Sequence, residues 1–170
     1  NTGAYRGQAR LERYFAPSEK AHYTIQFGVG NPVGSVVTDN RRVLEDNGWP
    51  NVEVRFAGRF GAVEEKMGGR KLAPFQLGVS GIIGQLRTTG IILAPGEIED
   101  PDRSVVDVHG LGLDAQLAFT NRFGLIGEVY LGDGHGEYSG AVLQSFNSVT
   151  SGVINAQGAW GELYYYASDI

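Results

Sequence analysis

The chain has 170 residues, including 26 Gly and no Cys, and its net charge is −5 at pH 7. The absence of Cys excludes disulfides, thiolate metal sites and Cys nucleophiles, and an acidic chain without a basic tract argues against non-specific nucleic-acid binding. No run approaches 18 apolar residues, so no transmembrane helix is expected, but a mean hydropathy of −0.16 also fits strands that alternate lipid-facing and water-facing residues.

Three strands are expected in the first part of the chain, because apolar and polar residues alternate there with a period of two. Residues 5–15 follow this pattern, although Arg13 interrupts it. Residues 21–29 and 52–60 follow it cleanly. In each segment one face is apolar and the other carries polar or small side chains, as in a sheet with two different environments.

Four more strands are expected in the second part of the chain. Residues 75–83 alternate apart from Ile82, and residues 111–119 and 123–131 alternate cleanly. Residues 153–166 have an ambiguous register because aromatic side chains crowd both faces. The sequence therefore predicts about seven strands, and the best helical candidate, Asn40–Asp46, is too short to matter.

The connections between these strands alternate strictly in length, shorter then longer. In an up-and-down sheet this alternation places all short turns at one end and all long loops at the other, as in outer-membrane barrels. The shorter connections are residues 16–19, 62–72 and 120–122, and the longer ones are residues 31–50, 88–103 and 133–152.

Aromatic residues gather on the apolar face near the expected short-turn end. Such a ring at one level is what a membrane–water interface favours, although strand ends in any β-sandwich can carry core aromatics. The candidate interface girdle consists of Phe15, Phe60, Phe75, Phe119, Phe123 and Tyr165.

The polar face combines Gly with Arg, Glu, Asp and Gln and has almost no Lys. The whole chain has 11 Arg and 3 Lys, and the planar guanidinium of Arg suits a crowded, partly confined wall. This favours the lining of a pore, while a solvated face with ordinary ion pairs stays open as the alternative. The candidate pore-lining residues are Arg6, Gln8, Arg10, Glu12, Glu53, Arg55, Arg59, Asp114, Gln116 and Glu128.

The tight turn at residues 120–122 predicts one specific contact. If Phe119 pairs with Phe123, Asp114 lies directly opposite Glu128 on the polar face. Two carboxylates in this position repel each other. We therefore expect an Arg from a neighbouring strand or an infolded loop between them; a bound cation or a shared proton would be the alternatives.

Motifs that suggest other chemistry are weak. Residues 110–115 match a dinucleotide-binding spacing, but an alternating strand follows where a helix is required. The acidic stretch of residues 96–102 could bind Ca²⁺, but its spacing defines no coordination shell. The three His residues lie on separate elements, and no nucleophile–base arrangement can be assembled. We expect no catalytic residue, no metal site and no cofactor.

Residues 110–132 resemble a strand–turn–strand hairpin of Gram-negative outer-membrane porins, as found in planctomycete-like and related bacteria. Residues 140–144 and 158–164 are similar to the next loop and strand of that family, and residues 49–52 are similar to a strand entry. The resemblance implies an all-β, antiparallel, up-and-down transmembrane β-barrel in the bacterial outer membrane. It implies contact with outer-membrane lipid and a homotrimer that passes small hydrophilic solutes, without enzymatic activity.

Seven is an odd number, whereas bacterial barrels of this kind have an even number of strands. Residues 1–170 are therefore expected to be a single barrel segment, part of the C-terminal half of a larger porin of ~14–18 strands. Two alternatives remain: a soluble, lipocalin-like ligand-binding β-barrel with its apolar face inside, and an outer-membrane barrel enzyme or adhesin. The porin hypothesis predicts that Phe27 and Phe56 point outward from the barrel and that Arg10 and Arg55 point into its channel.

Overall fold

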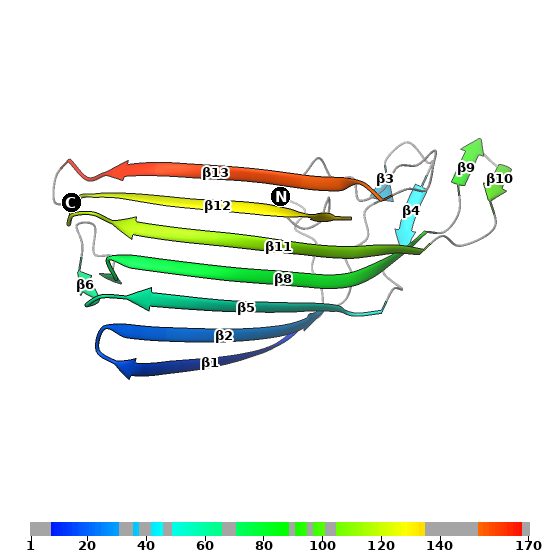
Figure 1. Ribbon diagram of the computed structural model, residues 1–170. Coiled ribbons are helices and arrows are strands. Elements are labelled where there is room, and N and C mark those ends of the chain that lie inside the picture. Colours follow the sequence, from blue (N-terminus) through cyan, green and yellow to red (C-terminus); the bar gives the residue numbers. More distant parts are fainter. Residues whose placement is uncertain are drawn as a thin grey trace.

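Seven long antiparallel strands form one curved sheet in the computed structural model (Figure 1). The structure describes residues 8–30, 36–37, 42–45, 49–65, 71–88, 91–94, 97–100, 105–134 and 153–167. The strands follow each other across the sheet in chain order. They are β1 (Gln8–Ser18), β2 (Ala21–Gly30), β5 (Asn51–Phe60), β8 (Phe75–Thr88), β11 (Val105–Ala118), β12 (Phe123–Asp133) and β13 (Asn155–Tyr165).

Six shorter strands lie in the connections. The pair β3 and β4 joins the main sheet through contacts of β4 with β8, whereas the other two pairs form separate hairpins. The residues considered as a helical candidate thus contain a strand. The short strands are β3 (Val36–Val37), β4 (Arg42–Glu45), β6 (Glu64–Glu65), β7 (Lys71–Leu72), β9 (Ile91–Ala94) and β10 (Glu97–Asp100).

All seven strands expected from the alternation are present, but several extend further. β1 continues to Ser18, β8 continues to Thr88, and β11 begins at Val105. The clean alternation of apolar and polar residues covers only part of each of these strands. Backbone pairing continues there because the ladder hydrogen bonds do not require apolar side chains.

The two kinds of connection lie at opposite ends of the sheet. The β1–β2 turn, β6 and the β11–β12 turn lie at one end, at the left of Figure 1, and β3, β4, β9 and β10 lie at the other. Most of the connection over residues 133–152 lies outside the described residues. For the described connections, the predicted separation into a turn end and a loop end is confirmed.

The seven strands form an open sheet, and the described residues do not close it into a barrel. Among the described strands, β1 pairs only with β2 and β13 pairs only with β12. Because every pairing along the path is antiparallel, β1 and β13 run in the same direction. A direct β1–β13 contact would be parallel, whereas an antiparallel barrel needs an even number of strands.

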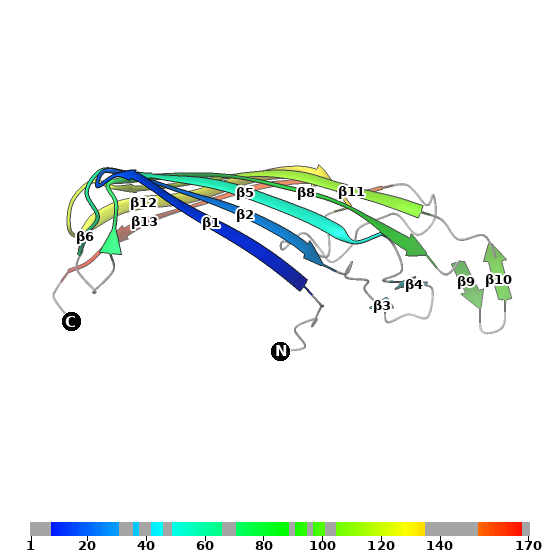
Figure 2. The same cartoon turned by 90° about the horizontal axis from the view of Figure 1, so that it is seen from below.

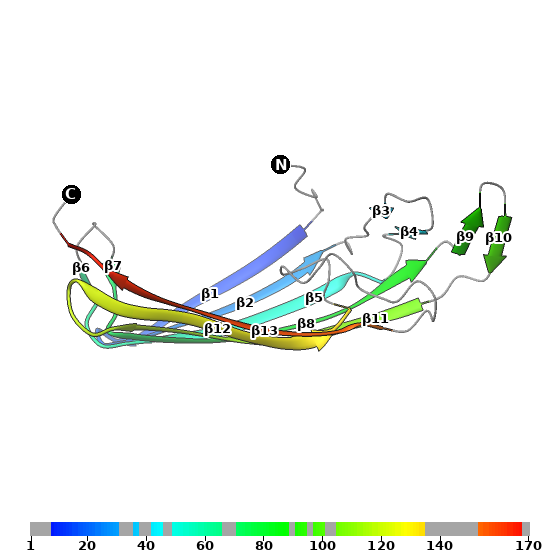
Figure 3. The same cartoon turned by 90° about the horizontal axis from the view of Figure 1, so that it is seen from above.

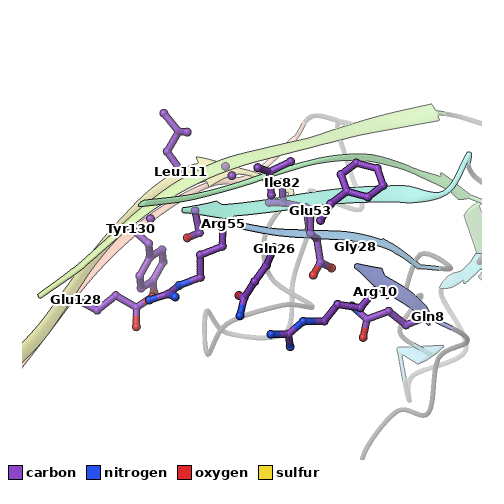
Figure 4. Close-up of a pocket in the computed structure, with 16 residues that line it drawn as sticks. Gln8, Arg10, Gln26, Gly28, Glu53, Arg55, Ile82, Leu111, Glu128 and Tyr130 are labelled. Carbon is purple, nitrogen blue, oxygen red and sulfur yellow. The ribbon is translucent and has the colours of Figure 1, made fainter. Parts of the chain in front are cut away.

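The sheet is arched (Figures 2 and 3), and its two faces carry different side chains. The convex face carries the large apolar side chains, and Phe27, Phe56 and Leu111 are 42%, 46% and 59% exposed. Arg10 and Arg55 lie on the opposite, concave face (Figure 4). The single layer has little interior: the largest fully buried side chains are Val108 and Asn51. The part of the chain that the structure describes has no helix long and apolar enough to cross a membrane.

Candidate functional site

A trough of about 300 Å³ crosses the concave face of the sheet (Figure 4). Polar side chains project into it from β1, β2, β5, β8 and β12, while Leu111 points away to the convex side. Glycines leave the backbone bare along its floor. The residues that define it best are Gln8, Arg10, Gln26, Gly28, Glu53, Arg55, Ser80, Gly110, Gly112, Glu128 and Tyr130.

The register of the sheet produces the trough, because residues paired across the strands share one face. The pairings join Gln26 with Arg55, Arg55 with Ser80, Ser80 with Gly112, and Gly112 with Tyr130. This row crosses five strands in succession. Side chains that are more than 100 residues apart in sequence therefore line a single depression.

An ion pair spans the middle of the concave face. Nη2 of Arg55 on β5 donates to both carboxylate oxygens of Asp114 on β11, at 2.8 and 2.7 Å. The two side chains are 30% and 29% exposed, so water partly screens the pair. β8 lies between these strands, and its Gly78 makes the contact possible because a Cβ there would overlap the Asp114 carboxylate and the Arg55 guanidinium.

Asp114 lies directly opposite Glu128, as the turn at residues 120–122 predicted. The expected guanidinium is Arg55, which reaches Asp114 from two strands away. Glu128 has a different partner: its Oε2 accepts a hydrogen bond from the indole Nε1 of Trp160, at 3.1 Å. The prediction of an Arg at this carboxylate pair is thus confirmed for Asp114, whereas Glu128 accepts a hydrogen bond from the neutral Trp160 indole on β13.

A second polar cluster lies at the edge of the sheet. Arg10 donates to Glu12 Oε2 at 2.7 Å, and Gln26 Nε2 donates to the same oxygen at 2.8 Å. The Arg10 and Glu12 side chains are 54% and 47% exposed. Since β1 has no neighbour on its outer side among the described strands, this cluster lies in water in the open sheet and contributes little to stability.

A third cluster lies on the concave face toward the turn end. Arg59 Nε donates to Gln76 Oε1 at 2.9 Å, and Gln116 is the register partner of Gln76. Tyr14 contacts the His22 ring through its hydroxyl. The polar face thus continues to the turns and is not limited to the trough.

The sequence identified most of the polar side chains on the concave face. Nine of the ten candidate pore-lining residues lie on that face by register, and Arg6 lies outside the described residues. The sequence reasoning missed Gln26, Ser80, Tyr130 and Trp160. The alternation did place Gln26, Ser80 and Tyr130 on the polar faces of their strands, but they were not selected as pore-lining residues, whereas the parity of Trp160 was ambiguous.

The candidate girdle aromatics lie on the convex side near the turns. Phe60 stacks with Phe75 at a centroid distance of 5.8 Å, and Phe119 stacks with Phe123 at 5.5 Å. Tyr165 is the register partner of Phe123. Phe15 lies one row of side chains further from the turn end than Phe60. The Arg13 guanidinium lies 5.5 Å from the centroid of the Phe15 ring.

Polar groups border the convex apolar surface at the opposite, loop end. His109 Nε2 lies 3.3 Å from Asp133 Oδ2, and Asn155 donates to Asp133 Oδ1 at 2.9 Å. Beside them, Gln85 donates to Asp107 Oδ1 at 3.1 Å. The apolar surface therefore has an aromatic border at one end and a polar border at the other.

The described side chains of the concave face interact through hydrogen bonds and ion pairs. Among the described residues, no group of three or more His, Cys, Asp or Glu side chains could hold a metal ion. No family model, curated protein or solved structure matches this chain. The resemblance to porins therefore stays a prediction, and the functional argument depends on the two faces of the sheet.

Proposed function

We propose that this chain is a segment of an outer-membrane porin, in which the concave face lines a water-filled channel for passive diffusion of small hydrophilic solutes. The convex face contacts lipid in this proposal. The observation that best supports this proposal is the distribution of polarity on the curved sheet: the convex face is apolar and the concave face is polar. Transmembrane barrels have this distribution, because lipid surrounds them and water fills them.

The size of the convex apolar surface supports a membrane-spanning role. In five central strands it covers nine-residue segments, residues 21–29, 52–60, 75–83, 111–119 and 123–131. A transmembrane β-strand needs about 9–11 residues. The apolar segments overlap across the sheet, with a shift of two residues between β8 and β11, so they form one continuous band between the aromatic and the polar border.

The same observation disfavours a soluble, lipocalin-like barrel. Such a protein places its apolar face inside, around the ligand. Here Ile25 and Val54, at 42% and 47% exposure, are on the convex face, where water would surround them. A contiguous apolar surface of this extent on a soluble monomer would promote aggregation or association.

The two open edges of the sheet, at β1 and β13, mean that a channel requires additional strands. Unpaired backbone groups at the outer sides of β1 and β13 cannot face lipid hydrocarbon. Since these two strands run in the same direction, antiparallel closure requires an odd number of additional strands. The proposed channel therefore consists of this sheet and further strands of the full-length protein.

Conductance of the full-length protein in a planar lipid bilayer tests the proposal directly. We expect stepwise current increases of uniform size, because each insertion event opens one water-filled pore of fixed geometry. Absence of channels from folded, purified protein would contradict the proposed function. Heat-unfolded protein from the same preparation is the control, and it should produce no steps.

Ion selectivity tests which side chains line the channel. We expect the double variant Arg10→Ala and Arg55→Ala to shift the selectivity toward cations, because it removes two positive charges and leaves the carboxylates of Glu53 and Glu128 on the same wall. The measurement is the zero-current potential across a tenfold KCl gradient. An unchanged potential would show that these two Arg side chains do not face the channel.

A further inference from the structure

The carboxylate of Glu128 differs from its neighbours in how its charge is balanced. Arg55 donates to both oxygens of Asp114, and Arg10 donates to Glu12. Among the described residues, Glu128 has no cation within ion-pair distance, and its partner is a neutral indole N–H. Within the described part of the chain, no direct ion pair therefore balances the Glu128 carboxylate, which is half-buried at one wall of the trough.

Trp160 holds this carboxylate in position. The two residues are direct register partners on β12 and β13, and Trp160 Nε1 donates to Oε2 of Glu128 at 3.1 Å. This leaves the other carboxylate oxygen, Oε1, available to a ligand on the side of Gly112. A fixed acceptor loses less conformational entropy on binding than a mobile one.

Two aromatic rings accompany the carboxylate. Tyr130 follows Glu128 by two residues on the same face of β12, and both project into the trough (Figure 4). Trp160 lies on the other side of Glu128, on β13, and is 50% exposed. A Cβ at Gly158 would overlap the Tyr130 ring, so the ring lies over the Gly158 backbone on the β13 side, the side that also carries Trp160.

This combination defines the chemical class of the ligand. A carboxylate gives a charge-assisted hydrogen bond to an N–H cation, and the faces of Tyr and Trp attract cations that are not strongly hydrated. Arg55, the nearby guanidinium, is paired with Asp114 through Nη2, and this ion pair offsets much of its attraction for an anion. A single carboxylate also offers too few oxygens for Ca²⁺, which takes six to eight.

We propose that Glu128, Tyr130 and Trp160 form a binding site for small organic cations that carry a guanidinium or amine group. The proposal deepens the proposed function, since it assigns a preferred solute class to the channel wall. Glu128 binds the N–H groups, Tyr130 covers the cation with its ring, and Trp160 positions the carboxylate.

Fluorescence provides a test that does not depend on conduction. The chain has two Trp residues, and comparing the Trp49→Phe variant with the Trp49→Phe, Trp160→Phe double variant isolates the signal of Trp160 in the full-length protein. In the folded full-length protein in detergent micelles, titration with methylguanidinium should change this fluorescence saturably. In the same background, Glu128→Gln should weaken the apparent affinity about tenfold or more, the size expected for loss of one charge-assisted contact.

The matched control is Glu12→Gln, which removes a carboxylate whose charge Arg10 balances. It should change the affinity less than about twofold. Equal weakening by both variants, or no weakening by Glu128→Gln, would overturn the proposed site. Replacing methylguanidinium with urea, which is neutral and similar in shape, should remove the response, and an equal response to urea would also contradict the proposal.

A second readout separates this site from the channel proposal. In planar bilayers, methylguanidinium should lower the K⁺ conductance of the Trp49→Phe protein at lower concentrations than it does for the Glu128→Gln variant. Channels without this difference would overturn the site and leave the porin proposal standing. Saturable binding in micelles by a protein that forms no channels would support the binding site and contradict the porin proposal.

Discussion

Replacing Leu113 with Arg should destabilise the membrane-inserted protein by about 2–4 kcal/mol, the cost of an Arg on the lipid face near the bilayer midplane. Leu113 lies in the middle row of the convex apolar band, between Val79 and Val129, and is 48% exposed. The measurement is the urea midpoint of the full-length protein folded into lipid vesicles.

The same experiment separates lipid from water as the surroundings of the convex face. A polar substitution at an exposed position of a water-soluble sheet changes stability by about 0.5 kcal/mol or less. Val105→Arg is the matched control, because Val105 is 52% exposed and lies beyond the polar border of the band. It should cost no more than about 1 kcal/mol near the interface. Equal, small effects at Leu113 and Val105 would contradict the proposed lipid contact.

Replacing Arg55 with Met should destabilise the fold by about 1–2 kcal/mol. The variant keeps the length of the side chain but removes two hydrogen bonds to Asp114, and it leaves the Asp114 carboxylate, which faces Glu128, without its guanidinium. The effect is smaller than for a fully buried pair, since both side chains are about 30% exposed. Urea unfolding in vesicles measures it.

A double-mutant cycle assigns this loss to the ion pair. Adding Asp114→Asn to Arg55→Met should recover part of the lost stability, because it removes one of the two facing negative charges. Arg10→Met is the matched control at the exposed edge pair, where a change below about 0.5 kcal/mol is expected. Additive effects of Arg55→Met and Asp114→Asn would contradict the role assigned to the pair.

The register of one hairpin could be predicted from a few residues. Asp114 lies opposite Glu128 because the β11–β12 turn is short and has defined local hydrogen bonds. Thr120 donates its backbone N–H to the Phe123 carbonyl at 3.1 Å, and its Oγ1 accepts from the backbone N–H of Phe123 at 3.0 Å. Such local constraints can be predicted from the sequence, because the length of a turn determines which residues pair on the two strands that it joins.

The candidate site was predicted only in part. Arg55, Asp114 and Glu128 were recognised as members of the polar face, but the sequence contains no sign of which carboxylate the guanidinium reaches. That choice depends on the space that Gly78 leaves on the intervening strand. It also depends on the parity of Trp160, which remained ambiguous among neighbouring aromatics until β13 was paired with β12.

The amino-acid sequence by itself determined the strands, their order and the two faces of the sheet, because a period of two is a local property of an extended chain. Only the tertiary structure decided that the apolar face is convex and the polar face concave, since the same alternation fits a sheet curved either way. It also decided that the seven strands leave two open edges. Curvature and closure depend on the twist and pairing of all strands together, which no single segment of the sequence encodes.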